Sequence, residues 1–105
     1  MENKTLNKLQ YFVIIGKPKL KEKLYSLLKE NNAHLLDTIY GHGSVSSNIL
    51  AQAFGLDSEQ KRVIISCLVP SENLSNLIQI LHEKYQFNKP NTGIAFSVPV
   101  EGIMF

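Results

Sequence analysis

The stretch KRVIISCLVP, residues Lys61–Pro70, is the clearest strand in the sequence. Its β-branched centre, Val63–Ile65, favours extended backbone, and Pro70 ends the run because proline lacks the N–H that a sheet requires. A second apolar run, Gln10–Ile15, is rich in aromatic and β-branched residues and stops at Gly16. Both runs are apolar at most positions, so we expect two strands in the middle of a sheet.

An amphipathic helix is predicted after each of these strands. Pro18 fits the first turn of the first helix, and Asn31–Asn32 supplies a polar stop. Ser71 is expected to cap the second helix. The apolar positions recur at helical spacing in both segments: Leu20, Leu24, Leu27 and Leu28 in the first, and Leu74, Leu77, Ile78, Leu81 and Tyr85 in the second.

Two shorter strands complete the pattern. The first is expected at Leu35–Tyr40, ended by Gly41, and the second at about Gly93–Val100. Pro99 requires that the last strand end there or lie at a sheet edge. Within that strand, Phe96 and Val98 are expected in the core.

The order strand, helix, strand, loop, strand, helix, strand predicts one α+β domain over residues 1–105. The expected fold is ferredoxin-like βαββαβ, a four-stranded antiparallel sheet with two helices on one face. A small extra helix, Ile49–Phe54, is expected in the loop between strands 2 and 3, residues 42–60. The strands are too apolar for the sheet face without helices to be exposed to water, so we also expect oligomerisation through that face.

Composition narrows the class of protein. The net charge of +2 is too small for a nucleic-acid-binding surface, and we expect no nucleic-acid partner. The single Cys67 lies in an apolar run, so no intrachain disulfide is expected. No apolar run reaches the roughly 18 residues of a membrane span, and the N-terminus does not read as a signal peptide. We therefore expect a cytoplasmic protein without membrane insertion.

Two glycine-containing motifs are the candidate ligand site. Gly41-His42-Gly43-Ser44 follows the second strand, and Lys89-Pro90-Asn91-Thr92-Gly93 precedes the last. Such turns present backbone N–H groups, here beside a lysine and a threonine hydroxyl, to an anion. Gly41 and Gly43 also fit turn positions that need a positive φ. The candidate ligand-binding residues, for a nucleotide or another anion, are Gly41, His42, Gly43, Ser44, Lys89, Asn91, Thr92 and Gly93.

The longer stretches that contain these motifs, Tyr40–Ser44 and Lys89–Val100, in this order and on this fold, resemble the PII nitrogen-regulatory superfamily, and above all its small divergent members. The resemblance covers about residues 9–101. It implies a non-enzymatic homotrimer that senses ADP, ATP, AMP or a small metabolite in clefts between subunits. It also implies that the 42–60 loop docks on a partner protein, such as a transporter or an enzyme of nitrogen metabolism.

The family pattern is incomplete in this chain. Ile94 stands where the family has a phosphate-binding lysine, and Ser44-Val45 replaces an arginine–glutamine pair. A charge-assisted hydrogen bond to phosphate contributes about 1.5–3 kcal/mol. Each replacement is therefore expected to weaken binding of ATP and 2-oxoglutarate.

Two alternatives share the fold. An acylphosphatase-type enzyme would use an anion-binding loop after the first strand with an arginine, but Gly16–Lys19 has only lysines and Arg62 lies in the third strand. A metal-linked trimer of the copper-tolerance type would need clustered ligands. The three histidines, His34, His42 and His82, show no zinc-ligand spacing within one chain. We therefore expect no catalytic residues and no metal.

Overall fold

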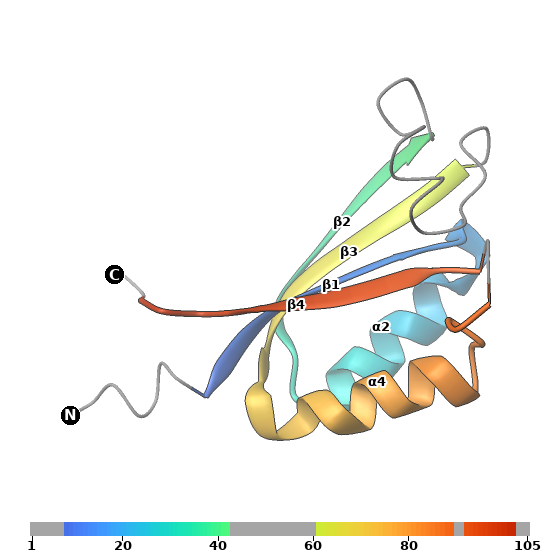
Figure 1. Ribbon diagram of the computed structural model, residues 1–105. Coiled ribbons are helices and arrows are strands. Elements are labelled where there is room, and N and C mark those ends of the chain that lie inside the picture. The colour runs from blue at the N-terminus through green and yellow to red at the C-terminus, as the bar shows by residue number, and fades with distance from the viewer. Residues whose placement is uncertain (1–7, 43–60, 90–91, 103–105) are drawn as a thin grey trace.

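The computed structural model describes residues 8–42, 61–89 and 92–102 (Figure 1). The helix expected at Ile49–Phe54 lies outside these residues. The described elements, in chain order, are β1 (Leu9–Gly16), η1 (Pro18–Leu20), α2 (Lys21–Glu30), β2 (His34–His42), β3 (Lys61–Pro70), η2 (Ser71–Asn73), α4 (Leu74–Glu83) and β4 (Ile94–Pro99).

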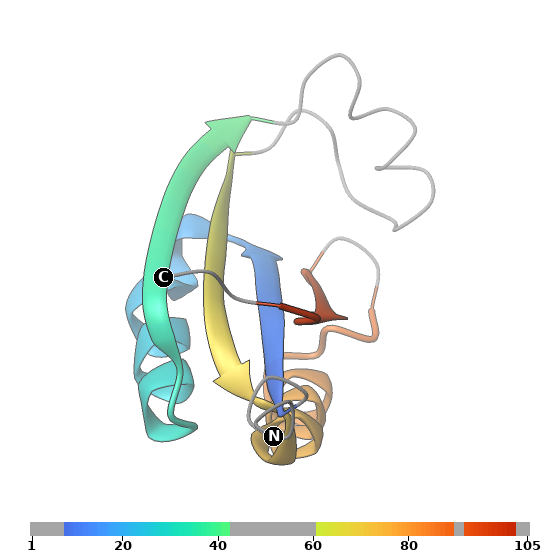
Figure 2. The ribbon, with the colours of Figure 1, turned by 90° about the vertical axis from the view of Figure 1, so that its left-hand side faces the viewer.

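The four strands form one antiparallel sheet in the order β2-β3-β1-β4. Both helices lie on the same face of this sheet, as Figures 1 and 2 show from two directions. β1 and β3 are the central pair, aligned from Leu9 opposite Pro70 to Gly16 opposite Val63. β4 lies at one edge and ends at Pro99, as the missing N–H requires. The ferredoxin-like fold is confirmed.

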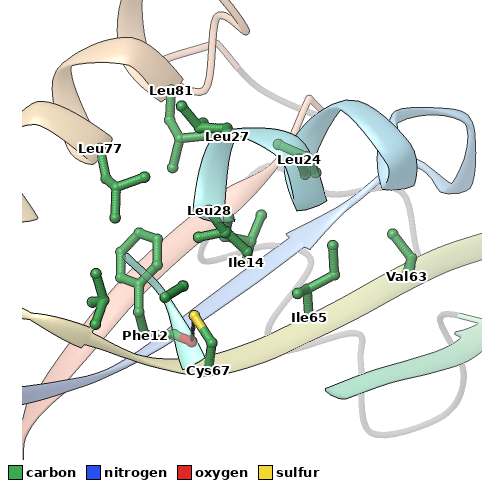
Figure 3. Close-up of a cluster of buried hydrophobic side chains, with 12 residues drawn as sticks. Phe12, Ile14, Leu24, Leu27, Leu28, Val63, Ile65, Cys67, Leu77 and Leu81 are labelled. Atoms are coloured by element: carbon green, nitrogen blue, oxygen red, sulfur yellow. Dashed lines mark hydrogen bonds between the residues drawn. The ribbon is translucent and has the colours of Figure 1, made fainter. Parts of the chain in front are cut away.

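The core fills the space between the helices and one face of the central strands (Figure 3). Alternate residues of β1 and β3 point toward the helices, because successive side chains of a strand face opposite ways. The leucines predicted at helical spacing meet them from α2 and α4. The labelled core residues in Figure 3 are Phe12, Ile14, Leu24, Leu27, Leu28, Val63, Ile65, Cys67, Leu77 and Leu81.

Asn31 joins the end of α2 to the start of α4. Its side chain is buried, and its amide Nδ2 donates to the Leu27 carbonyl at 2.9 Å. Asn73 Nδ2 donates to the Asn31 carbonyl at 2.7 Å, and Asn76 Nδ2 donates to Asn31 Oδ1 at 2.8 Å. The asparagine predicted to end the first helix therefore also links the two helices through hydrogen bonds. Asn32 follows it with φ 64°, a left-handed conformation that asparagine tolerates.

The predicted Ser71 cap is wrong. α4 begins at Leu74, after the short η2, and its N-cap residue Asn73 makes no side-chain cap bond. The Ser71 hydroxyl instead accepts a hydrogen bond from Gln10 Nε2 at 3.1 Å, which links η2 to the start of β1.

The second face of the sheet carries several exposed apolar side chains. Phe96 is 46% exposed and Val98 is 48% exposed, so the expectation that they lie in the core is wrong. They stand opposite Val13 and Tyr11 of β1, on the face away from the helices. Ile39 of β2, 58% exposed, lies on the same face, opposite Ile64.

Replacing Asn31 by alanine tests the tie between the helices. Asn31→Ala leaves buried polar groups without partners, and we expect a loss of about 1–3 kcal/mol in the free energy of unfolding. Urea denaturation measures it. The control is Asn88→Ala, at an exposed asparagine, which should change stability by less than about 0.5 kcal/mol. Equal stability of the two variants would contradict the role given to Asn31.

Candidate functional site

The two candidate motifs lie at the same end of the sheet. β2 ends at His42, within the first motif, and β4 begins at Ile94, immediately after the second. Neighbouring strands run in opposite directions. The same end of the sheet therefore contains the last residues of β2 and β1 and the first residues of β3 and β4 (Figures 1 and 2). Of the candidate residues, Gly43, Ser44 and Asn91 lie outside the described residues.

Within one chain, however, the motifs belong to opposite edges of the sheet. β3 and β1 separate β2 from β4. Three interstrand spacings of about 4.8 Å put roughly 14 Å between the two edge strands. Within one subunit, the backbone of Gly41 and the start of β4 are therefore too far apart to contact the same phosphate group.

β2 extends two residues further than the sequence predicts. Gly41 pairs with Arg62 and His42 pairs with Lys61, so both lie within the strand. Gly41 has no positive φ, and a Cβ added there would meet no atom within 4 Å. Gly41 therefore lies in a strand and not in a turn, and the space around its Cα is open.

A pocket of about 350 Å³ lies beside Gly41, where β2 ends and β3 begins. Its lining residues are Pro18, Tyr40, Gly41, Lys61 and Arg62. Lys61 is the exposed basic residue of this set, and its charge suits an anionic ligand; Arg62 is buried, and its side chain faces the other side of the sheet. We call this space the β2-end pocket. No sequence motif indicated Lys61 or Arg62 as a lining residue, although their place directly after the 42–60 loop predicts that they pair with the end of β2.

Lys21 joins α2 to the wall of the β2-end pocket. Its ammonium nitrogen lies 5.8 Å from the centroid of the Tyr40 ring and 5.4 Å from that of Tyr25. Hydrogen bonding to Tyr40 is the main cause of a raised Lys21 pKa. The hydroxyls of Tyr25 and Thr38 are hydrogen-bonded to each other, so a polar and aromatic chain runs from α2 to β2.

The turn before β4 is held by Thr92. Its Oγ1 lies 2.7 Å from the carbonyl oxygens of both Gln86 and Lys89, and its single proton is donated to one of them at a time. Gln86 has φ 59°, which lets the chain reverse after α4. The Lys89 side chain is exposed and can reach an anion.

Gly93 is needed for close packing. An added Cβ would lie 2.4 Å from the nearest atom of the Phe87 ring. The same ring lies 3.8 Å from where a Cβ on Gly16 would be, so Phe87 closes this end of the core between the two glycines. The glycine that the sequence assigns to ligand binding therefore also has a structural role.

Cys67 is buried, and burial raises the pKa of its thiol to about 11. Its Sγ lies 3.7 Å from the Phe12 carbonyl oxygen. The described residues contain no cluster of three or more His, Cys, Asp or Glu side chains that could hold a metal. No helix among them is long and apolar enough to cross a membrane.

Comparison with known proteins gives matches among solved structures. No family model matches the chain, and no curated protein matches it in sequence. A PII-like signaling protein from Thermus thermophilus superposes with a TM-score of 0.62 at 19% identity, over 86% of this chain and 83% of that chain. CPII from Thiomonas intermedia, bound to ADP, AMP and acetate, superposes with a TM-score of 0.63 at 18% identity, over 85% of this chain and 82% of that chain.

A plant protein has the same fold. PII of Arabidopsis thaliana, bound to citrate, gives a TM-score of 0.62 at 18% identity, over 90% of this chain and 79% of that chain. The chain therefore has the fold of PII-like signaling proteins. The resemblance predicted from the two glycine motifs is confirmed at the level of the fold.

Replacing Gly93 by alanine tests the packing against Phe87. Gly93→Ala forces the ring to move, and we expect a loss of about 1–3 kcal/mol in the free energy of unfolding, measured by urea denaturation. Gly41→Ala, where a Cβ meets open space, should leave stability unchanged. The double variant Gly93→Ala/Phe87→Leu should lose less than the sum of the two single changes. Strict additivity would contradict the contact.

Cys67 should be inert toward thiol reagents. At pH 8 the buried thiol is protonated and shielded, so labelling by an aromatic disulfide reagent is expected to be slow. After unfolding in denaturant, one thiol per chain should react within minutes. Rapid labelling of the folded protein would show that Cys67 is accessible.

Proposed function

We propose that this chain is a PII-like signal-transduction protein, a cytoplasmic and non-enzymatic homotrimer that binds an adenine nucleotide between subunits. The supporting observation is the placement of the two candidate motifs at one end of the sheet but at opposite edges. A complete site needs the end of β2 from one subunit and the turn before β4 from the next. A closed ring supplies that arrangement at every interface.

The open sheet face supports assembly. Tyr11, Ile39, Phe96 and Val98 are each more than 40% exposed and belong to three strands of one face. Isolated exposed apolar residues are ordinary on protein surfaces, but a contiguous apolar sheet face indicates an interface. Packing three such faces around an axis would remove this surface from water.

Charge and the structural neighbours support a nucleotide as the ligand. The exposed Lys61 lines the β2-end pocket, and Lys89 is exposed beside the turn before β4. CPII, which shares the fold, is bound to ADP and AMP. Because Ile94 replaces the lysine of the family motif, we assign phosphate binding to Lys61 and Lys89, with ADP, AMP or ATP as ligand. A small metabolite is the alternative effector.

Signal output is assigned to the 42–60 loop. The loop joins β2 to β3, and the residues on either side of it, Gly41 and Lys61, both line the β2-end pocket, so a ligand in this pocket contacts both flanks of the loop. Such a ligand can favour one loop conformation only through its differential affinity for the alternatives. The partner in this proposal is a transporter or an enzyme of nitrogen metabolism.

The acylphosphatase alternative is disfavoured by the residues after β1. That connection passes from Gly16 through Lys17 into η1 and carries no guanidinium. Arg62, the one arginine of the chain, is buried in β3.

Light scattering and thermal melting test the proposal together. The expected mass is three times that of the chain. ADP or another adenine nucleotide at a hundred times its Kd should stabilise the folded protein by about 2.7 kcal/mol, which raises the melting temperature. A monomer whose melting temperature is unchanged by ADP, AMP and ATP would contradict the proposal.

A further inference from the structure

We infer that Tyr40 binds the nucleobase of the ligand by stacking, while the neighbouring Lys61 binds its phosphates. This inference rests on the proposed function and assigns separate parts of the ligand to separate residues of the β2-end pocket. Lys61 lies outside the motifs that suggested the site from the sequence, and Tyr40 was not among the candidate ligand-binding residues.

The position of Tyr40 is unusual for a large aromatic residue. It stands opposite Val63, a fully buried core residue of β3, and therefore on the helix side of the sheet. Even so, 61% of Tyr40 is exposed. Its edge position leaves the ring uncovered at the wall of the β2-end pocket.

Lys61 lies on the same side of the sheet as Tyr40. Lys61 and Val63 are two residues apart in β3, and side chains two apart in a strand share a face. A ring and an ammonium group therefore line one pocket from neighbouring strands. A nucleotide has the complementary pair of groups, a flat base and a charged phosphate.

Lys21 restrains the Tyr40 side chain before any ligand arrives. Its ammonium group is held near both Tyr40 and Tyr25, and Tyr25 is itself tied to Thr38. A tyrosine restrained in this way loses little conformational entropy when a base stacks on it. The contact with Lys21 thus gives a structural reason for an exposed but ordered ring.

Substitutions at Tyr40 separate stacking from charge. Stacking of a base on an aromatic ring stabilises the complex, so Tyr40→Ala should weaken ADP binding about tenfold, as measured by isothermal titration calorimetry. Tyr40→Phe keeps the ring and should stay within about twofold of the wild type. Lys61→Gln should weaken ADP binding as well, whereas Lys84→Gln, which removes the same charge from the end of α4, should not.

A second readout reports the base contact itself. The ring proton resonances of Tyr40 should shift upfield when ADP binds, and should shift much less with pyrophosphate, which has no base. Thermal melting of each variant checks that it folds. If a variant is unfolded, the resonance shift in the wild type decides the question.

The outcomes distinguish this inference from the proposed function. If the wild type binds no adenine nucleotide, the proposed function fails and the inference fails with it. If the wild type binds ADP while folded Tyr40→Ala binds it equally well, only the inference is overturned. It is also overturned if ADP leaves the Tyr40 resonances unmoved.

Discussion

The antiparallel pairing of β1 with β3 is the constraint on which the rest of this structure depends. Both strands carry apolar side chains on both faces, so each face of the sheet favours a cover. α2 and α4 cover one face, and their leucines complete a core around Phe12 and Ile14. The other face has no cover within the described residues, and Phe96 and Val98 remain exposed there. The need to cover that second face is the physical basis for proposing an oligomer.

The same strand order controls where a ligand can bind. Placing β1 and β3 at the centre leaves β2 and β4 at the two edges, with the two glycine motifs at one end. Because β3 and β1 separate the two edges, the proposed site is completed by a neighbouring subunit. In that proposal the β2-end pocket contributes Tyr40 and Lys61 from the β2 side.

Periodicity predicted much of the fold from the sequence. The spacing of Leu24, Leu27 and Leu28 identified the buried face of α2, and Pro99 correctly marked the end of an edge strand. The faces of β4 could not be predicted, because they depend on register with β1, and Phe96 was assigned to the wrong side. Pairing across the sheet also extended β2 to His42.

The candidate site was less predictable than the fold. Local motifs located Gly41 and Gly93, but the contact of Gly93 with Phe87 and the nearness of Lys21 to Tyr40 depend on tertiary packing. A crystal structure of the protein grown with ADP tests the central claim most directly. The nucleotide should lie between the end of β2 of one subunit and the turn before β4 of its neighbour, in a ring of three. A nucleotide held by one chain alone, or a crystal of monomers, would contradict it.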